Sequence, residues 1–280
     1  MDPTTIDLTR GAALKQIEDE EFVRTHPQSL AMQERARKSM PFGVPMVWME
    51  FSYDHSPIYV DSGEGTYFTD IDGHHYVDFC LGDTGAMTGH APPPAVEAMA
   101  RQAARGITLM LPTEDAAWVG EELARRFGLP QWQFTLSATD ANRFAIRLCR
   151  HITGRPKILV YNGCYHGTVD ETIVALDGGR VVPRRGSIGP PVDPAATTRV
   201  VEWNDLPALG EALSHGDVAC VLAEPVMTNI GIIPPEPGYH DELRRLTREA
   251  GTLLIIDETH TICAGPGGYT RAHGLQPDLL

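Results

Sequence analysis

Residues 252–260 read Thr-Leu-Leu-Ile-Ile-Asp-Glu-Thr-His, and this stretch decides the fold. Five apolar or β-branched residues follow Gly251, and the run stops at Asp257 and a second carboxylate. A strand that is buried on both faces of a parallel sheet has this composition. The run 218–223, which ends at Glu224, repeats the pattern. Because ligands of open α/β sheets bind at the carboxyl edge of the strands, we predict that the two acids face one crevice.

Helices and strands alternate through the rest of the chain after about residue 90. Strands that are separated by helices of about ten or more residues imply right-handed crossovers and a mainly parallel sheet covered on both faces. We therefore predict an α/β fold. The expected strands are 132–136, 157–161, 199–202, 218–223 and 252–256, and the expected helices lie between Pro94 and Gly106, between Thr113 and Gly128, and at 138–151, 206–214 and 239–250.

Apolar stripes predict which faces of the first three helices are buried. The stripes are Val96, Met99, Ala100 and Ala103 in the first helix, Ala116, Val119, Leu123 and Phe127 in the second, and Ala141, Phe144, Ala145 and Leu148 in the third.

Three other parts of the chain have their own character. Residues 1–40 are polar and predict a helical arm that packs on another domain or subunit. Short alternating segments between residues 58 and 79, with turns at 62–65 and 70–73, predict a small antiparallel sheet. The loop 177–196 is rich in glycine, proline and arginine, so we expect it to be mobile or to contact a partner.

Composition excludes several classes of protein. The net charge is −14 and the basic residues are scattered, which argues against a nucleic-acid or anionic-membrane surface. Five widely spaced cysteines fit neither a simple disulfide framework nor a thiolate zinc site, and they favour a reducing compartment. We expect no signal peptide, because the first twenty residues have neither a basic start nor an apolar stretch, and the sequence contains no apolar run of the roughly 18 to 20 residues that a membrane span requires. We predict a cytoplasmic protein.

The turn Ser137–Asn142 lies between an expected strand and an expected helix. Backbone amides at a helix start, the positive end of the helix dipole and the Thr139 hydroxyl would together form a phosphate cradle. The alternative is ordinary helix capping, with Ser137 as the N-cap residue and Asp140 closing a capping box.

A second loop, residues 162–167, follows the expected strand 157–161 at the same sheet edge. Its glycines allow close approach of the backbone to a ligand, and the ring of Tyr165 can lie flat on a planar group. At the neighbouring strand end, the Asp257 carboxylate could pair with a ring nitrogen of a ligand. The alternatives are a simple turn for the loop, and for Asp257 or its neighbour Glu258 a capping role or an arginine partner.

No motif for a metal or a nucleotide is present. The histidines do not follow a His-Glu-x-x-His or similar spacing, and Gly-x-Gly-x-x-Gly, Walker and Gly-x-Ser-x-Gly motifs are missing. We therefore predict no metal site, and a metal hydrolase is disfavoured.

Taken in order, these stretches resemble the class III (omega-type) aminotransferases, which are pyridoxal-phosphate enzymes of fold type I, and in particular their glutamate-semialdehyde aminomutase branch. The resemblance covers about residues 35–280. The matching motifs are Gly63-Glu-Gly, Asp70-Ile-Asp-Gly, Tyr76-Val-Asp-Phe, Gly89-His90, Ser137–Asn142, Tyr165-His166-Gly167, Glu224-Pro225, Ile256-Asp257-Glu258 and Pro277-Asp-Leu-Leu280.

The resemblance implies pyridoxal 5′-phosphate as cofactor and assigns roles to residues of this chain. Asp257 would pair with the ring nitrogen and keep it protonated, so that the ring can accept electrons. Tyr165 would stack on the ring, and Thr139 would hold the phosphate with its amide and hydroxyl. The remaining residues implied at the cofactor site are Ser137, Ala138, His166, Glu224 and Thr259.

Departures from the family pattern bear on substrate and on turnover. Trp48 falls close to an arginine that receives the substrate carboxylate in the aminomutase branch, and an indole offers an apolar wall without a bidentate fork. We therefore expect a transaminase that moves an amino group between an amine or amino acid donor and a carbonyl acceptor in a hydrophobic pocket. Ala138 and Asp140 stand where the family usually has glycine and glutamate, and Thr259 replaces a valine.

The family's Schiff-base lysine would follow Leu280, where this chain stops, so we expect the 280 residues as given to be inactive. The alternatives are an aminomutase, which moves an amine within one molecule, and a catalytically silent homologue or fragment. The resemblance implies an arm with part of a small domain at residues 1–75 and a large cofactor-binding domain at 76–280, without the carboxyl-terminal part of the small domain. It also implies a homodimer that acts on small-molecule amines and carbonyl compounds.

Overall fold

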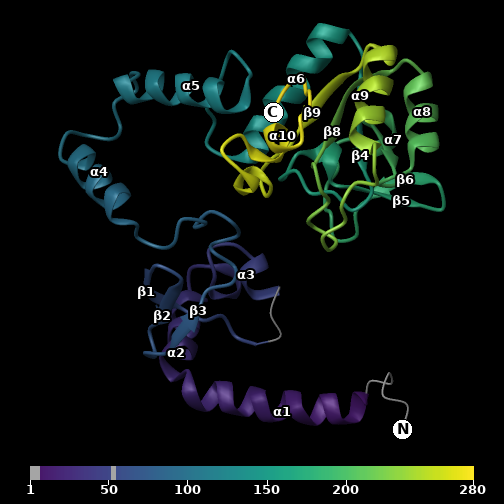
Figure 1. Ribbon diagram of the computed structural model, residues 1–280. Helices are drawn as coiled ribbons and strands as arrows, with labels where there is room; N and C mark the ends of the chain where they lie inside the picture. The colour runs from purple at the N-terminus through teal and green to yellow at the C-terminus, as the bar shows by residue number, and fades with distance from the viewer. Residues whose placement is uncertain (1–6, 52–54) are drawn as a thin grey trace. The chain divides into compact units, whose positions relative to one another are not determined.

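The computed structural model describes residues 7–51 and 55–280. The chain divides into two compact units, residues 1–109 and 110–280. In Figure 1 the first unit is coloured purple to blue and the second teal to yellow. Each unit contains a β-sheet of its own.

The polar stretch that begins the first unit folds into two helices, α1 (Leu8–Thr25) and α2 (Pro27–Ala36). Asp7 caps α1, because its side chain accepts hydrogen bonds from two amides of the first turn at 3.1 Å. No residue of α1 is buried, whereas α2 buries one side. The predicted helical character of this stretch is confirmed, and its packing on another domain or subunit stays a prediction.

The small sheet of the first unit is antiparallel, in the order β1-β2-β3. Its strands are β1 (Val60–Glu64), β2 (Tyr67–Asp70) and β3 (His75–Val77). The turn between β2 and β3 lies where the sequence predicted it, but the first hairpin reverses only at Gly65 (φ 55°) and the residue after it. The first unit also contains η1 (Pro41–Gly43), α3 (Trp48–Phe51) and α4 (Pro93–Ala103).

The second unit has a four-stranded parallel sheet in the order β7-β4-β8-β9. The strands are β4 (Lys157–Tyr161), β7 (Thr198–Val201), β8 (Val218–Ala223) and β9 (Leu253–Ile256). All six residues of the central strand β8 are buried. The mainly parallel α/β fold predicted from the apolar runs is confirmed.

Helices pack on this sheet and bury apolar side chains against it. They are α6 (Ala138–Thr153), α8 (Leu206–Ser214) and α9 (Tyr239–Ala250). Figure 1 shows α8 and α9 next to each other on one side of the strands and α6 on the other. Leu209, Leu243 and Ile146, one from each helix, are 0–1% exposed. The sheet is therefore covered on both faces, as predicted.

Two predictions about the second unit are wrong. Residues 132–136 form no strand ladder with any residue that the structure describes, and Leu136 is fully exposed. In α6 the buried face is Asn142, Ile146 and Cys149, whereas the predicted stripe leaves Phe144 and Leu148 each 53% exposed. Periodicity identifies residues that share a face of a helix, but it does not determine which face the sheet covers.

The helices α4 and α5 (Glu114–Phe127) form where predicted, but neither buries a residue. The prediction that their apolar stripes are buried is therefore wrong: Met99 and Val119, one from each stripe, are 64% and 37% exposed. Large apolar side chains that remain exposed on one helix face are typical of interaction surfaces.

The glycine-rich loop 177–196 is partly regular. A hairpin of β5 (Val174–Asp177) and β6 (Arg180–Pro183) turns at Gly178 and Gly179, and both have positive φ, as a two-residue type I′ turn requires. The other short elements are α7 (Pro194–Thr197), α10 (Gly268–Ala272), η2 (Asp170–Thr172) and η3 (Ile262–Ala264). Among the described residues, none of the helices has the length and hydrophobicity needed to cross a membrane.

Candidate functional site

Asp257 lies at the carboxyl end of β9, next to the end of β8. Its amide donates to the carbonyl of Ala223 at 2.8 Å, which keeps the two strand ends in register. The side chain is 7% exposed. Oδ2 accepts hydrogen bonds from Asn142 Nδ2 at 3.0 Å and His166 Nδ1 at 2.7 Å, and Oδ1 accepts from the amide and hydroxyl of Thr259 at 3.0 and 2.5 Å. Four donors therefore fix the orientation of this carboxylate.

The electrostatics of the site favour a charged pair. Burial alone would raise the pKa of Asp257, but the hydrogen bond and charge of His166 and the hydrogen bonds from Thr259 lower that pKa well below its usual value. Burial also opposes a charged His166, whereas the adjacent Cys164 and the Asp257 carboxylate raise its pKa to about 10. Asp257 is therefore ionised and His166 protonated at neutral pH.

His166 lies beneath the site rather than on its surface. The imidazole is buried, and Nε2 has no hydrogen-bond partner among the described residues. The carbonyl of His166 accepts a hydrogen bond from Asn142 Nδ2 at 3.3 Å. One asparagine on α6 thus contacts both the loop after β4 and the end of β9.

The start of α6 is compatible with both interpretations of residues 137–142 that the sequence left open, helix capping and phosphate binding. Ser137 is the N-cap residue: its hydroxyl oxygen accepts from the amide of Asp140 at 3.2 Å, and its proton points to the Asp140 carboxylate at 3.1 Å. The next two amides, of Ala138 and Thr139, have no hydrogen-bond partner among the described residues. Capping and anion binding are therefore compatible, because the cap satisfies a different amide.

The loop after β4 is fastened to this helix start. The Thr168 amide donates to Thr139 Oγ1 at 3.1 Å. Gly167 has φ of 81°, and a Cβ added there would lie 2.1 Å from Thr139 Oγ1, so only glycine fits. Tyr165, on the same loop, is 47% exposed. Two of the predicted segments, 137–142 and 162–167, therefore meet Asp257 at one edge of the sheet.

The remaining predicted residues have other surroundings. Glu224 is buried and accepts from the amide and hydroxyl of Thr228 at 3.2 and 2.5 Å, so it shapes the loop after β8. Thr259 holds Asp257 through its own hydrogen bonds. Trp48 belongs to the first compact unit and is 50% exposed, so its place in a substrate pocket stays a prediction.

The sequence alone did not predict the contacts of Asn142, and it did not separate the role of Glu258 from that of Asp257. Asn142 had no assigned role, although a polar residue in helical register with Ile146 and Cys149 is a signal for a buried hydrogen-bonding group. Glu258 is buried and accepts from the amides of Tyr269 and Thr270 at 3.0 and 2.5 Å, at the start of α10. The capping role therefore falls to Glu258, whereas Asp257 faces His166.

The comparisons with known proteins agree with this geometry. The family described as "Aminotransferase class-III" matches residues 49–280. Glutamate-1-semialdehyde 2,1-aminomutase of Methanothermobacter thermautotrophicus is 38% identical over 250 residues, which are 88% of this chain and 59% of that protein. This chain spans about 60% of the length of the curated relatives it matches.

Solved structures give the same result. The crystal structure of a glutamate-1-semialdehyde-aminomutase from Pseudomonas aeruginosa PAO1 has a TM-score of 0.94 and 55% identity, over 98% of this chain and 60% of that chain. A lysine-to-alanine variant of that enzyme was crystallised in complex with PMP. An omega-transaminase from Sphaerobacter thermophilus has a TM-score of 0.84 and 32% identity, over 89% of this chain and 59% of that chain.

Proposed function

The chain belongs to the class III aminotransferase family, and on this premise we propose that it forms the cofactor-binding part of an enzyme that uses pyridoxal 5′-phosphate to transfer an amino group. The observation that carries the proposal is the ionised, four-fold hydrogen-bonded Asp257 at the end of β9. Its contacts through Asn142 and the loop after β4 connect it to the start of α6.

The residues present fit this cofactor. Two amides that have no hydrogen-bond partner in the described part of the chain lie at the positive end of a 16-residue helix and suit a phosphate, and the Thr139 hydroxyl still has its proton to donate. Tyr165 is exposed enough to lie on a ring face. When bound, the cofactor supplies an electron sink for the carbon that loses a proton.

The chain's own residues would keep the ring nitrogen protonated. A carboxylate whose pKa is well below its usual value stays ionised and attracts a proton to a ring nitrogen beside it. The His166 imidazolium keeps Asp257 charged through its Nδ1, which donates to the carboxylate at 2.7 Å. Because the imidazolium is already protonated, it does not take up the proton of the ring nitrogen. Asn142 and Thr259 fix the direction of the carboxylate, and hydrogen bonds to a charged group contribute about 1.5–3 kcal/mol each.

Transfer within one molecule is the form of the reaction that we propose first. The relatives at 38% and 55% identity are named as aminomutases, which reverses the order that we expected from the sequence. Transfer between an amine donor and a separate carbonyl acceptor is the second candidate. It is favoured by Trp48, whose indole would offer an apolar wall to a hydrophobic substrate.

No lysine of the second compact unit lies at the Asp257 edge of the sheet. Lys157 begins β4 at the opposite edge, where its Nζ lies 3.5 Å from Asp217 Oδ2. Pyridoxamine 5′-phosphate, the amine form of the cofactor, needs no lysine for binding, and the lysine-to-alanine relative was crystallised with PMP. This form is therefore the probe of choice for the 280-residue chain.

Calorimetric titration with pyridoxamine 5′-phosphate tests the cofactor proposal. We expect saturable binding at one molecule per chain, which inorganic phosphate weakens by competition at the α6 amides. A titration without saturation would contradict the proposal. In a clone that supplies the predicted lysine, conversion of glutamate 1-semialdehyde without an added amino acceptor would support an aminomutase, whereas a strict need for an acceptor would favour a transaminase.

We also propose a homodimer in the cytoplasm that acts on small-molecule amines and carbonyl compounds. Exposed apolar residues on α4, α5 and α6, such as Met99, Trp118 and Phe144, suit burial against a second copy. All five cysteines lie in the described residues and have free thiols, in keeping with a reducing compartment.

A further inference from the structure

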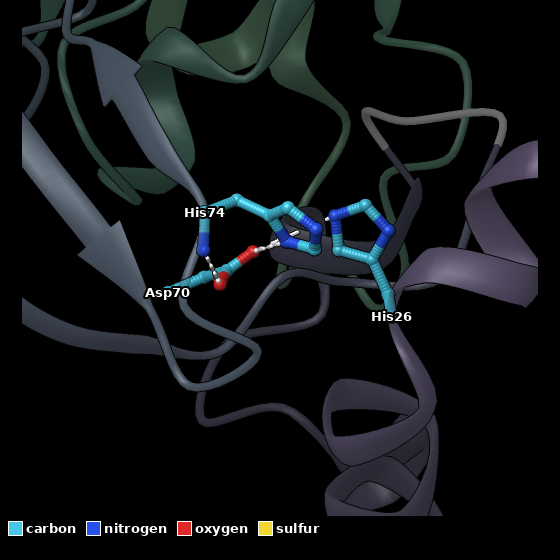
Figure 2. Close-up of side chains that lie close together, drawn as sticks. All are labelled: His26, Asp70 and His74. Atoms are coloured by element: carbon cyan, nitrogen blue, oxygen red, sulfur yellow. Dashed lines mark hydrogen bonds and ion pairs between the residues drawn. The ribbon is translucent and has the colours of Figure 1, made fainter.

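A cluster of potential metal ligands lies in the first compact unit, which does not contain Asp257. His26, Asp70 and His74 each place one ligand atom within 4.8 Å of the others. Figure 2 shows the two imidazole rings next to each other, with the Asp70 carboxylate beside them. We propose that these three residues bind a divalent transition-metal ion, with Zn²⁺ as the best match to two imidazoles and one carboxylate.

The distances suit coordination by one ion. His26 Nε2 lies 3.5 Å and His74 Nδ1 lies 3.0 Å from Asp70 Oδ2. For zinc bonds of about 2.05 Å these separations subtend angles of about 117° and about 94° at the ion, which bracket the tetrahedral value. The His74 side chain is 38% exposed, and its ring lies beside that of His26, with centroids 4.5 Å apart.

His26 is oriented as a metal ligand. Its Nδ1 lies 3.0 Å from the carbonyl of Phe22 and 2.9 Å from the Thr25 hydroxyl, whose own proton goes to the carbonyl of Glu21 at 2.7 Å. A proton on Nδ1 satisfies these contacts. The ring also stacks on Phe22, with centroids 4.1 Å apart. In that tautomer Nε2 carries a lone pair, and it lies 2.7 Å from the Tyr76 hydroxyl and 3.5 Å from Asp70 Oδ2. A hydrogen bond from the other ring nitrogen to a carbonyl is the usual second contact of a metal-bound histidine.

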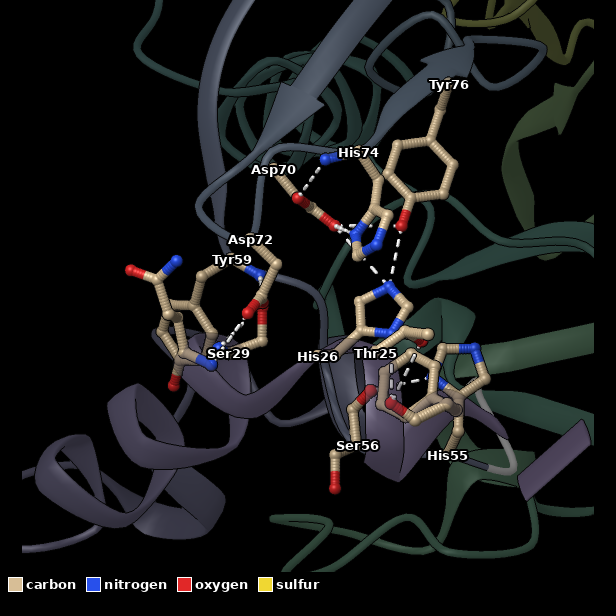
Figure 3. A network of polar contacts seen from close by, with 12 residues as sticks. Thr25, His26, Ser29, His55, Ser56, Tyr59, Asp70, Asp72, His74 and Tyr76 are labelled. Atoms are coloured by element: carbon tan, nitrogen blue, oxygen red, sulfur yellow. Dashed lines mark hydrogen bonds and ion pairs between the residues drawn. The ribbon is translucent and has the colours of Figure 1, made fainter. Parts of the chain in front are cut away.

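When the proton is on Nδ1, hydrogen bonding within the protein leaves the Nε2 lone pair of His26 under-satisfied. The Tyr76 hydroxyl lies 2.7 Å from His26 Nε2 and 2.8 Å from Asp70 Oδ2, but it has one proton for the two acceptors. Figure 3 shows the three groups in contact. A cation between His26 and Asp70 would satisfy both lone pairs, while Tyr76 keeps its hydrogen bond to the carboxylate. The competing arrangement is the other neutral tautomer, in which Nε2 donates to the Tyr76 hydroxyl and Nδ1 accepts from the Thr25 hydroxyl.

The surroundings hold the ligands in place before an ion binds. Asp70 is 1% exposed, and its Oδ1 accepts from the amide of His74 at 2.8 Å. In the same turn, Asp72 caps α2 by accepting from the amides of Gln28 and Ser29 at 2.7 and 2.9 Å. The turn that carries Asp70 and His74 is thereby fastened to the helix that follows His26, so binding requires little reorganisation.

We predicted no metal site because the histidines follow no ligand spacing. Our proposal departs from that prediction, because the fold brings His26, between α1 and α2, next to a hairpin turn far along the chain. An ion there would join the helical arm to the small sheet and would stabilise the folded chain by binding it selectively.

Titration of the chelator-treated, full 280-residue chain with Zn²⁺ tests this proposal. We expect one tightly bound Zn²⁺ per chain and a higher thermal unfolding midpoint with Zn²⁺. His74→Ala should lower the affinity at least about tenfold and abolish the thermal shift. His75→Ala is the matched control: this neighbour contacts Thr69 at 2.9 Å, is exposed, and should leave Zn²⁺ binding unchanged.

Absence of Zn²⁺ binding, or equal affinities in the wild type and His74→Ala, would overturn the proposal, as would an equal loss in His75→Ala.

Co²⁺ gives a readout that needs no variant. Visible absorption bands that saturate at one Co²⁺ per chain and disappear on addition of Zn²⁺ would support the site, and bands that rise without saturation would count against it. Titrations with pyridoxamine 5′-phosphate are independent of the metal result, because they report on residues 110–280, which contain Asp257.

Discussion

Replacing Asp257 with asparagine removes one partner of the buried pair with His166. The amide side chain would also present an N–H₂ group to donors that now converge on the carboxylate from Asn142, His166 and Thr259. The variant therefore loses a charge and at least one accepted hydrogen bond. We expect it to fold, but with lower stability.

The magnitude follows from the pKa of His166, which rises from 6.5 to about 10 in the folded chain. At pH 7 this shift corresponds to about 4 kcal/mol of folding free energy. Removal of one partner of a buried ion pair typically costs about 3–5 kcal/mol, so the two magnitudes agree. Because Cys164 also raises the pKa of His166, about 4 kcal/mol is an upper bound, and Asp257→Asn should lower the free energy of unfolding by about 3 to 4 kcal/mol at pH 7.

The pH dependence has a definite sign. A group whose pKa is raised on folding contributes its full stability below its unfolded pKa and loses it as the pH rises through the folded value. The difference between wild type and Asp257→Asn should therefore be largest at and below neutral pH and shrink as the pH rises toward the folded pKa of His166, about 10. Asp257 itself, whose pKa is lowered, contributes above its usual pKa and loses that contribution as the solution is acidified.

Urea unfolding of both chains at several pH values measures these differences. Asp217→Asn is the control, since Asp217 pairs with Arg199 at 2.7 Å at the opposite edge of the sheet and is 27% exposed. The loss there should be about 1 kcal/mol or less. A pH-independent difference, or equal losses in the two variants, would refute the reasoning.

Three further predictions concern the cofactor edge. Gly167→Ala should cost at least about 2 kcal/mol more in unfolding free energy than Gly216→Ala, because both glycines have positive φ but only Gly167 would place a Cβ against Thr139. Thr139→Val removes the acceptor of the Thr168 amide, and thermal unfolding should show a loss of about 1–3 kcal/mol. Tyr165→Ala should weaken pyridoxamine phosphate binding about tenfold in calorimetry, whereas Tyr165→Phe should retain it. An unchanged affinity in Tyr165→Ala would exclude stacking.

An element was predictable from sequence where its composition is unambiguous or where a specific residue ends it. β8 and α9 begin and end where predicted, because β8 is an unbroken apolar run and Gly251 stops α9 in a left-handed conformation. Residues 132–136 carry only composition, and an extended segment becomes a strand only when a neighbour pairs with it. The covered face of α6 depends on where the sheet lies, which local periodicity does not contain.

At the candidate site, too, local sequence signals were predictive and contacts between distant segments were not. Asp257 and the loop 162–167 were predictable, because polar groups that follow buried parallel strands share one sheet edge. The Asn142 contacts and the division of roles between Asp257 and Glu258 depend on side-chain geometry between distant segments. His26 is a clear example: it lies 50 residues before Tyr76, and only the fold brings the two together.

A crystal structure of the chain grown with pyridoxamine 5′-phosphate tests the central proposal most directly. We expect the ring nitrogen within hydrogen-bond distance of the Asp257 carboxylate, the phosphate on the amides of Ala138 and Thr139, and the Tyr165 ring on one face of the pyridine. A cofactor bound elsewhere, with Asp257 contacting only His166, Asn142 and Thr259, would contradict it.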